Sequence, residues 1–116
     1  MTSLRVLVIE DEPLIAMMVE DYLDILGHSV AGVADSVTDG VRLIGDGGVD
    51  AAICDVNLRD GPSWPVADAL RAAGIPFLIA TGGHVEPPPP AHAAAPQLAK
   101  PFTLDGLEAA LGKLTT

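Results

Sequence analysis

The sequence predicts an α/β fold, a doubly wound sandwich in which one parallel sheet lies between two layers of helices. Five short apolar runs of strand type, at 4–9, 30–34, 49–54, 76–80 and 97–99, alternate with stretches whose apolar residues recur at helical spacing. The first, third and fourth runs are almost continuously apolar, which is typical of strands buried on both faces of a parallel sheet. This alternation implies right-handed crossovers, with helices on both faces of the sheet.

The first two helices are marked by the residues at their ends. Pro13 suits the first turn of a helix, and Gly27 is expected to end that helix. Its apolar stripe is predicted to consist of Ile15, Met18, Val19, Tyr22 and Leu26. Ser36 and Asp39 form a capping box that opens a second, shorter helix. The apolar residues of that helix are Val37, Val41 and Ile44.

Two further helices follow the third strand and the last strand. Ser63 is expected to cap the first of them, with Pro65 in its first turn and Gly74 at its end. The residues expected to face inward are Val66, Ala69, Leu70 and Ala73. Thr103 is expected to cap the final helix. The apolar residues of the final helix are Leu104, Leu107, Leu111 and Leu114.

The segment 82–97, "GGHVEPPPPAHAAAPQ", stands where a further crossover helix would lie. It contains prolines at 87–90 and at 96, and each proline in a helix interior costs about 3 kcal/mol. We therefore expect a short, irregular or disordered segment in place of that helix. A semi-rigid loop is the favoured interpretation, and a pre-extended polyproline recognition strip is the alternative.

Composition narrows the class of protein. The 116 residues suit one domain, 1–116, with a single core. A formal net charge of -10 disfavours binding to nucleic acid or to an anionic membrane surface. The apolar run that opens the chain is too short for a signal peptide or a membrane span, and the single cysteine, Cys54, excludes an internal disulfide. We expect a cytoplasmic protein.

Polar residues stand where the predicted strands end. Glu10 and Asp11 follow the first strand, Asp55 the third, Thr81 the fourth and Lys100 the fifth. The carboxyl ends of strands in an open parallel sheet form its binding edge, so these side chains are expected to converge. Two like charges about 4 Å apart repel by about 4 kcal/mol at an effective dielectric constant near 20. A hard divalent cation relieves that repulsion, and Mg²⁺ suits a site built from carboxylates, water and a phosphoryl group.

Four short motifs together carry a resemblance to a known family. They are "VLVIEDEP", "AAICDVNLRDG", "IATG" and "AKPF", in this order and at the expected strand ends. The set resembles the receiver domain of two-component response regulators over essentially the whole chain. The resemblance implies a flavodoxin-like (βα)5 fold, a five-stranded parallel sheet of order 2-1-3-4-5, and a stand-alone receiver in residues 1–116 without an output domain.

The resemblance also implies roles for the acidic residues. Asp55 matches the phosphoacceptor, and Glu10 and Asp11 match the acidic pair that holds Mg²⁺ or another divalent cation such as Mn²⁺ or Ca²⁺. Asn57 matches the position whose backbone carbonyl completes the metal shell. A carboxylate nucleophile carries no proton, so in-line attack on phosphorus needs no general base, and positioning and charge neutralisation supply most of the catalysis.

Other matches concern the phosphoryl group and the switch. Thr81 matches the hydroxyl residue that bonds the phosphoryl group, and Lys100 matches the family's lysine, with Lys100 to Pro101 at its usual cis peptide. Receivers usually carry an aromatic switch residue three positions before the lysine, and this chain has Gln97 there. "PFLIATGGH" is similar in part to the FAT GUY subgroup of single-domain receivers, named for a Phe-Ala-Thr-Gly-x-Tyr motif, in which the fourth helix is short or disordered.

These implications predict a receiver that takes a phosphoryl group from a histidine of its partner and acts as a relay or a sink. The partner would be a sensor histidine kinase, of HWE type if the subgroup holds, or a histidine phosphotransferase. It would dock near the first helix and the Lys100 loop. Leu14 and Met17 lie off the inward stripe of the first helix and are either excess apolar surface or part of that docking patch. We expect a monomer or a weak dimer.

Two other classes of function share residue types with this one. A Mg-dependent phosphoaspartyl phosphatase of haloacid dehalogenase type uses the same residue types, but its nucleophile lies on the first strand in a D-x-D-x-[TV] pattern. Here Asp11 is followed by Glu12, and Pro13 stands where that pattern has its second aspartate. A binding-only pseudo-receiver would lack the acceptor, the lysine or the hydroxyl, and all three are present.

Several residues are expected to be structural only. Cys54 is interpreted as core packing, and Trp64 as an anchor between surface and core near the third helix. His28, His84 and His92 are scattered among loops without metal-ligand spacing, so we expect them to be solvated.

Overall fold

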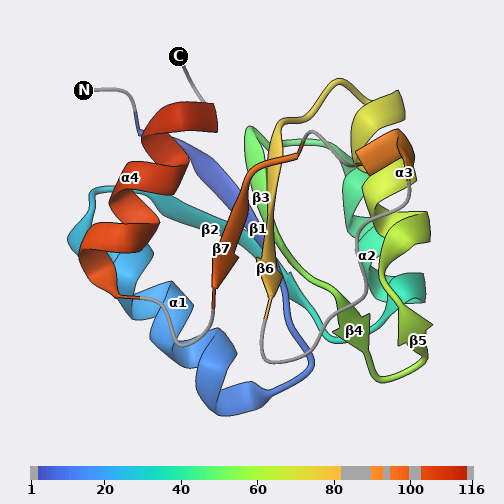
Figure 1. Cartoon of the computed structure of the whole chain (residues 1–116), viewed down its shortest axis with the longest axis horizontal. Helices are drawn as coiled ribbons and strands as arrows, with labels where there is room; N and C mark the ends of the chain where they lie inside the picture. The colour runs from blue at the N-terminus through green and yellow to red at the C-terminus, as the bar shows by residue number, and fades with distance from the viewer. Residues whose placement is uncertain (1–2, 82–89, 93–94, 100–102, 115–116) are drawn as a thin grey trace.

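The computed structural model describes residues 3–81, 90–92, 95–99 and 103–114. Within them, five parallel strands form one sheet (Figure 1). The strands are β1 (Arg5–Ile9), β2 (Ser29–Ala34), β3 (Ala51–Asp55), β6 (Phe77–Thr81) and β7 (Gln97–Ala99). Their order across the sheet is β2-β1-β3-β6-β7, which confirms the predicted α/β class and the order 2-1-3-4-5.

Among the described residues, two helices cover each face of the sheet (Figure 1). The helices are α1 (Pro13–Ile25), α2 (Val37–Asp46), α3 (Trp64–Ala72) and α4 (Leu104–Leu114). Successive side chains of a strand point to opposite faces, so Val6 and Val8 of β1 pack on the α1 and α4 side, whereas Leu7 and Ile9 pack on the α2 and α3 side. The sheet is thus buried on both faces, as its apolar strands predict. Within the described ranges, every helix is too short or too polar to cross a lipid bilayer.

Two of the predicted helix caps are confirmed. The Ser36 hydroxyl accepts a hydrogen bond from the Asp39 N–H at 3.2 Å at the start of α2. The Thr103 hydroxyl accepts one from the Gly106 N–H at 3.0 Å at the start of α4. Each bond satisfies an amide of the first turn that has no partner inside the helix.

The predicted cap of α3 is correct in position and wrong in chemistry. Ser63 is the residue that precedes the helix, but its side chain makes no cap hydrogen bond. Its backbone, at φ -83° and ψ 6°, is not in the extended conformation typical of a capping residue. The Ser63 hydroxyl is buried and hydrogen-bonds instead with the Cys54 thiol.

The inward face of α2 contains a glycine, and the inward face of α3 differs from the prediction. On α2, the apolar Val41 is 41% exposed, whereas Gly40 is buried. A Cβ atom at position 40 would lie 3.0 Å from Val66 Cγ2, so the absent side chain allows α2 to approach α3 closely. The predicted Ala73 is exposed and follows the last residue of α3, whereas Ala67 is buried with Val66.

The inward face of α1 overlaps the predicted apolar stripe but is slightly rotated from it. The residues of α1 with the deepest burial are Ala16, Val19 and Leu23. The other members of the predicted stripe flank them and are partly buried against the same core. The predicted face of α4 is confirmed, with Leu107 and Leu111 buried and Leu104 and Leu114 partly buried.

The proline-rich segment 82–97 is described only in part. Its described residues contain one short 3₁₀ turn, η1 (Pro90–His92), before β7 begins. Residues 82–89 and 93–94, which include His84 and three of the four consecutive prolines, lie outside the described ranges.

The expectation that His92 is solvated is wrong. Its side chain is 1% exposed, and its ring stacks on Trp64 with 5.7 Å between ring centroids and contacts Phe77 edge-on. Its Nε2 hydrogen-bonds with Asp68 Oδ1 at 2.7 Å, while its buried Nδ1 has no hydrogen-bond partner among the described residues. The histidine therefore attaches η1 to α3 through Trp64 and Asp68, and to β6 through Phe77. Local sequence does not indicate these contacts.

Candidate metal and phosphoryl site

The carboxyl ends of β1, β3 and β6 bring the predicted site residues together at one edge of the sheet. Ile9 of β1 pairs with Cys54 of β3, so Glu10 and Asp55 are the next residues along two neighbouring strands. Asp55 in turn pairs with Ala80, which places Thr81 one residue farther along β6. This edge lies at the lower end of the sheet in Figure 1. The convergence follows from the parallel order because strands of one direction end at one edge.

Three carboxylates form the centre of this edge. Glu10, Asp11 and Asp55 each offer an oxygen, and these oxygens all lie within 4.8 Å of one another. Glu10 is 5% exposed, Asp55 is half-buried and Asp11 is exposed. A pair of carboxylates at this separation repels by roughly 3 kcal/mol at an effective dielectric constant near 20, and by less where solvent screens the exposed Asp11. The cluster therefore favours a bound cation.

The oxygen donors fit a hard divalent ion. An octahedral Mg²⁺ with ligand distances of about 2.1 Å has ligand oxygens about 3 to 4 Å apart, so the three carboxylates need to close only slightly. Carboxylate and backbone carbonyl oxygens are the ligands that Mg²⁺, Mn²⁺ and Ca²⁺ prefer over nitrogen or sulfur. One carboxylate is already oriented, because Glu10 Oε2 accepts the Glu12 N–H at 3.1 Å.

Asn57, the predicted source of a carbonyl ligand, lies in a short hairpin that the sequence analysis did not identify. The hairpin comprises β4 (Asn57–Leu58) and β5 (Gly61–Pro62), directly after Asp55. Asn57 pairs with Pro62 across the hairpin. A signal was present in the sequence, because Asp-Gly at 60–61 is a frequent turn dipeptide.

Of the remaining predicted site residues, the structure describes Thr81 and Gln97 but not Lys100 or Pro101. Thr81 is half-buried at the end of β6 and pairs with Ala99 of β7. Lys100 and Pro101 lie outside the described residues, so the role of each stays a prediction. Gln97 is exposed at the start of β7, where it pairs with Ile79.

Two further acidic residues lie close to Glu10 and Asp11, and the sequence did not lead us to expect them there. Asp35 and Asp39 line a cleft of about 310 Å³ together with Glu10 and Asp11. Asp35 follows the last residue of β2, so the rule that identified the other strand ends also applied to it. Asp35 also pairs with Arg59 of the hairpin loop, Nη2 to Oδ1 at 3.1 Å.

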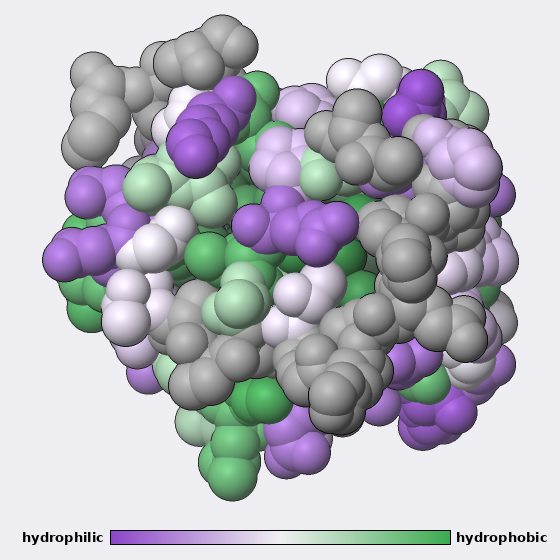
Figure 2. Space-filling model, viewed as in Figure 1, coloured by the Kyte–Doolittle hydropathy of each residue, from purple (hydrophilic) through white to green (hydrophobic). Residues whose placement is uncertain are grey.

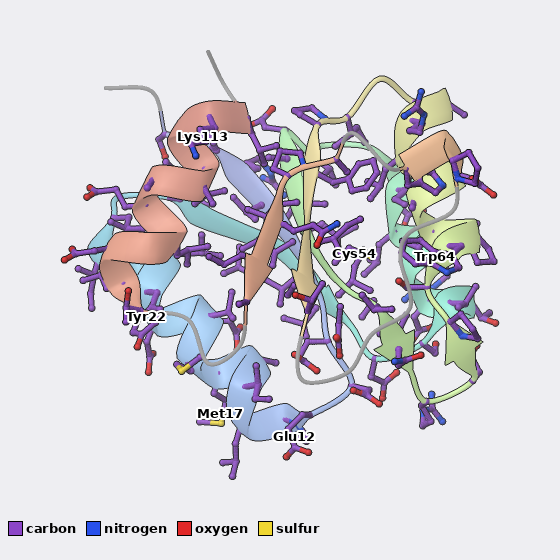
Figure 3. The ribbon with its side chains drawn as sticks, in the orientation of Figure 1. Glu12, Met17, Tyr22, Cys54, Trp64 and Lys113 are labelled. Carbon is purple, nitrogen blue, oxygen red and sulfur yellow. The ribbon has the colours of Figure 1, made fainter. Side chains whose placement is uncertain are left out.

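Cys54 adjoins the acceptor position but has the properties of a core residue. It is 1% exposed on the α3 side of the sheet (Figure 3). Burial raises the pKa of its thiol to about 11, so the thiol stays protonated near neutral pH. The interpretation of Cys54 as core packing is confirmed.

Apolar surface adjoins the acidic edge at the beginning of α1. Leu14 is 73% exposed and Met17 is 58% exposed. Figure 2 shows apolar side chains at the lower edge of the molecule over this part of α1, and Figure 3 shows Met17 pointing away from the core. The expected exposure of both residues is thus confirmed.

Comparison with known proteins identifies the family. No family model matches the chain. The solution structure of SdrG from Sphingomonas melonis Fr1 is 47% identical over the whole of both chains, with a TM-score of 0.88, and its BeF3-activated conformation gives 0.84. The receiver domain of the response regulator PhyR from Erythrobacter litoralis is 27% identical over 97% of this chain and 90% of that domain, with a TM-score of 0.78. The chain belongs to the receiver domains of response regulators.

A curated relative extends the comparison. The phyllosphere-induced regulator PhyR of Methylorubrum extorquens strain AM1 is 39% identical over 80 residues. The match covers 66% of this chain and 30% of that regulator. The chain therefore spans less than a third of PhyR in this match, and the likeness concerns one part of that protein.

Proposed function

We propose that the chain accepts a phosphoryl group on Asp55 from a phosphohistidine donor, in a reaction that depends on Mg²⁺ or a similar divalent cation. The observation that carries the proposal is the cluster of Glu10, Asp11 and Asp55 within 4.8 Å, with Thr81 at the end of the adjacent strand. A further support comes from SdrG, whose solved structures include a BeF3-activated conformation.

The reaction follows from the chemistry of these groups. An oxygen of Asp55 attacks phosphorus in line, the bond from phosphorus to the donor's imidazole nitrogen breaks, and that nitrogen keeps the bonding electrons. The product is an acyl phosphate on Asp55, and attack by water on phosphorus later returns the carboxylate and inorganic phosphate. When bound, the cation supplies positive charge that lowers the repulsion between the carboxylates and the incoming phosphoryl group.

The chain's own residues position this reaction. Glu10 and Asp11 would hold the cation together with Asp55. The backbone carbonyl of Asn57 would be a further protein ligand. The Thr81 hydroxyl would donate a hydrogen bond to a phosphoryl oxygen, and Lys100 would neutralise another. The chain would thus catalyse its own phosphorylation and dephosphorylation, without turnover of a separate substrate.

The test is phosphorylation by a small donor. Acetyl phosphate with Mg²⁺ is expected to add one phosphoryl group to the wild-type chain, detected by intact-mass spectrometry, and to add none to Asp55→Asn. Asp50→Asn is the matched control, because Asp50 is exposed just before β3, at the opposite end of that strand from Asp55. An unmodified wild-type chain, or equal labelling of Asp55→Asn, contradicts the proposal. Steady release of phosphate from p-nitrophenyl phosphate would instead support the phosphatase alternative.

The proposed partner is a sensor histidine kinase, of the HWE type, or a histidine phosphotransferase. It would dock on the exposed residues Leu14 and Met17 of α1 and on the loop at Lys100, because the donor's phosphohistidine must reach Asp55. A cytoplasmic location and a monomeric or weakly dimeric state stay predictions.

The proposed docking surface at Leu14 and Met17 can be tested by introducing a charge there. Met17→Glu is expected to slow phosphoryl transfer from a phosphorylated HWE-type kinase and to leave labelling by acetyl phosphate unchanged. Ile25→Glu is the matched control, since Ile25 is 66% exposed on the same helix but about 12 Å farther along its axis. Equal transfer to Met17→Glu and wild type would place the docking surface elsewhere.

A further inference from the structure

The hairpin β4–β5 is held at its base and its middle by the core of the protein. The Ser63 N–H donates to the Val56 carbonyl at 2.8 Å, which closes the base of the hairpin. Leu58 is 6% exposed and packs in the core on the α2 and α3 side. Asn57 lies between these two attachments, on the strand that leaves Asp55.

The hydrogen-bond pattern of the hairpin leaves the Asn57 carbonyl for another partner. Directly opposed residues in an antiparallel pair alternate between hydrogen-bonded and non-hydrogen-bonded positions. Val56 and Ser63 occupy a hydrogen-bonded position, so the next pair, Asn57 and Pro62, occupies a non-hydrogen-bonded one. At such a position the carbonyl points away from the partner strand. The ladder therefore does not use the Asn57 carbonyl, which is the arrangement a metal ligand requires.

The tip of the hairpin has two polar attachments to the start of α2. Asp60 Oδ1 accepts a hydrogen bond from the Val37 N–H at 2.8 Å. This bond is the main reason why the pKa of the Asp60 carboxyl lies below its ordinary value. Arg59 adds its ion pair to Asp35, which precedes the same helix. A residue 23 positions away in the sequence thus satisfies the first amide of α2.

We propose that Asp60, assisted by Arg59, is a positioning residue that holds the Asn57 carbonyl in place for the divalent cation. The inference rests on the proposed function, because it assumes that the cation binds at Glu10, Asp11 and Asp55. Two-stranded hairpins are marginally stable by themselves, and Mg²⁺ demands near-ideal octahedral geometry. Attachment at the tip therefore limits the movement of β4, which carries Asn57. The short β4–β5 ladder alone would not hold it as firmly.

The first test measures Mg²⁺ affinity by isothermal titration calorimetry. Asp60→Ala is expected to raise the Kd for Mg²⁺ about tenfold, the lower end of the range for loss of an outer partner of a metal ligand. Asp60→Asn, which keeps a weaker acceptor in the same place, is expected to fall between Asp60→Ala and wild type.

A matched control separates attachment of the hairpin from stability of α2. Ser36→Ala removes the other side-chain cap of the same helix end, the bond from the Asp39 N–H, and leaves the hairpin contact intact. It is expected to destabilise the fold, measured by urea unfolding, without changing the Kd for Mg²⁺. Asp60→Ala is expected to change both.

A second variant removes the donor instead of the acceptor. Val37→Pro deletes the N–H that Asp60 accepts, and proline is favoured at the first position of a helix. Ser36 has φ -146° and ψ 161°, the extended conformation that a residue before proline prefers. Val37→Pro is expected to weaken Mg²⁺ binding, and the double variant with Asp60→Ala is expected to bind no more weakly than Asp60→Ala alone.

The outcomes distinguish this inference from the proposed function. Wild-type affinity in both Asp60→Ala and Val37→Pro, with Mg²⁺ bound by the wild-type chain, overturns the inference alone. An equal loss of affinity in Ser36→Ala also overturns it, since the effect would then come from α2. Absence of Mg²⁺ binding by the wild-type chain overturns the metal site and the inference with it. If Asp60→Ala does not fold, Asp60→Asn and Val37→Pro give the decision.

Discussion

The two faces of the sheet have cores of different chemistry. Among the described residues, every buried member of the core under α1 and α4 is aliphatic. The face under α2 and α3 instead contains the Cys54 thiol and the Ser63 hydroxyl, and His92 is buried against Trp64 and Phe77 on that face. A buried polar group destabilises a fold unless it is hydrogen-bonded, whereas an aliphatic group only needs to be covered. The first face therefore depends on burial alone, and the second depends on specific partners.

The face with the polar groups is also the face to which two loops are attached. The hairpin after β3 contacts α2 through Asp60, and the turn η1 after β6 contacts α3 through His92. Both loops follow strands that end at the acidic edge. Changes in the aliphatic face should thus alter stability broadly, while changes in the polar face should depend on which partner is removed.

The largest effect is expected from a cavity in the aliphatic face. Leu107 of α4 is 0% exposed, and Leu107→Ala is expected to lower the free energy of unfolding by about 3 kcal/mol, through lost burial and an unfilled cavity. Urea unfolding measures this change. The control is Glu108→Ala, at an exposed position of the same helix, with a change within about 0.5 kcal/mol. A loss below about 1 kcal/mol for Leu107→Ala would mean that this core readjusts around the cavity.

A smaller and partner-dependent effect is expected at His92. His92→Ala is expected to lower the free energy of unfolding by about 2 kcal/mol, because two ring contacts and a hydrogen bond are lost. His92→Phe is expected to lie within about 1 kcal/mol of wild type. It keeps a ring between Trp64 and Phe77 and removes the buried Nδ1, which has no partner in the part of the chain that the structure describes. Asp68, 69% exposed, regains water. Equal losses for the two variants would assign the stabilisation to the hydrogen bond rather than to the rings.

The smallest effect is expected from titration of Asp60. Its pKa is lower in the folded chain than in the unfolded chain, so its contribution to stability is present above about pH 4, the ordinary range of an aspartate, and is lost as the pH falls through the lowered value. Carboxyl carbon shifts measured by NMR against pH are expected to show this lowered pKa in the wild type. Val37→Pro should move the pKa of Asp60 back toward its ordinary value. An unchanged pKa in that variant would mean that the Val37 N–H is not its cause.

Much of the fold and the centre of the site could be predicted because they depend on local pattern and strand direction. Glu10, Asp11 and Asp55 converge since each lies at the carboxyl end of a buried strand and parallel strands end at the same edge. Asp35 obeys the same rule and was missed, although its position after the second strand carried that signal. The burial of Gly40 could not be predicted in the same way, because it depends on the close packing of α2 on Val66.

The sequence by itself determined the α/β class, the order of elements and the acidic edge, because apolar periodicity and the ends of strands are recorded locally along the chain. The tertiary structure alone decided that His92 is buried and that Asp60 contacts the start of α2. Both contacts join residues more than twenty positions apart, and neither residue lies in a periodic pattern. The energy of such a contact depends on what the fold places opposite the side chain, and that information is not present in the neighbouring residues.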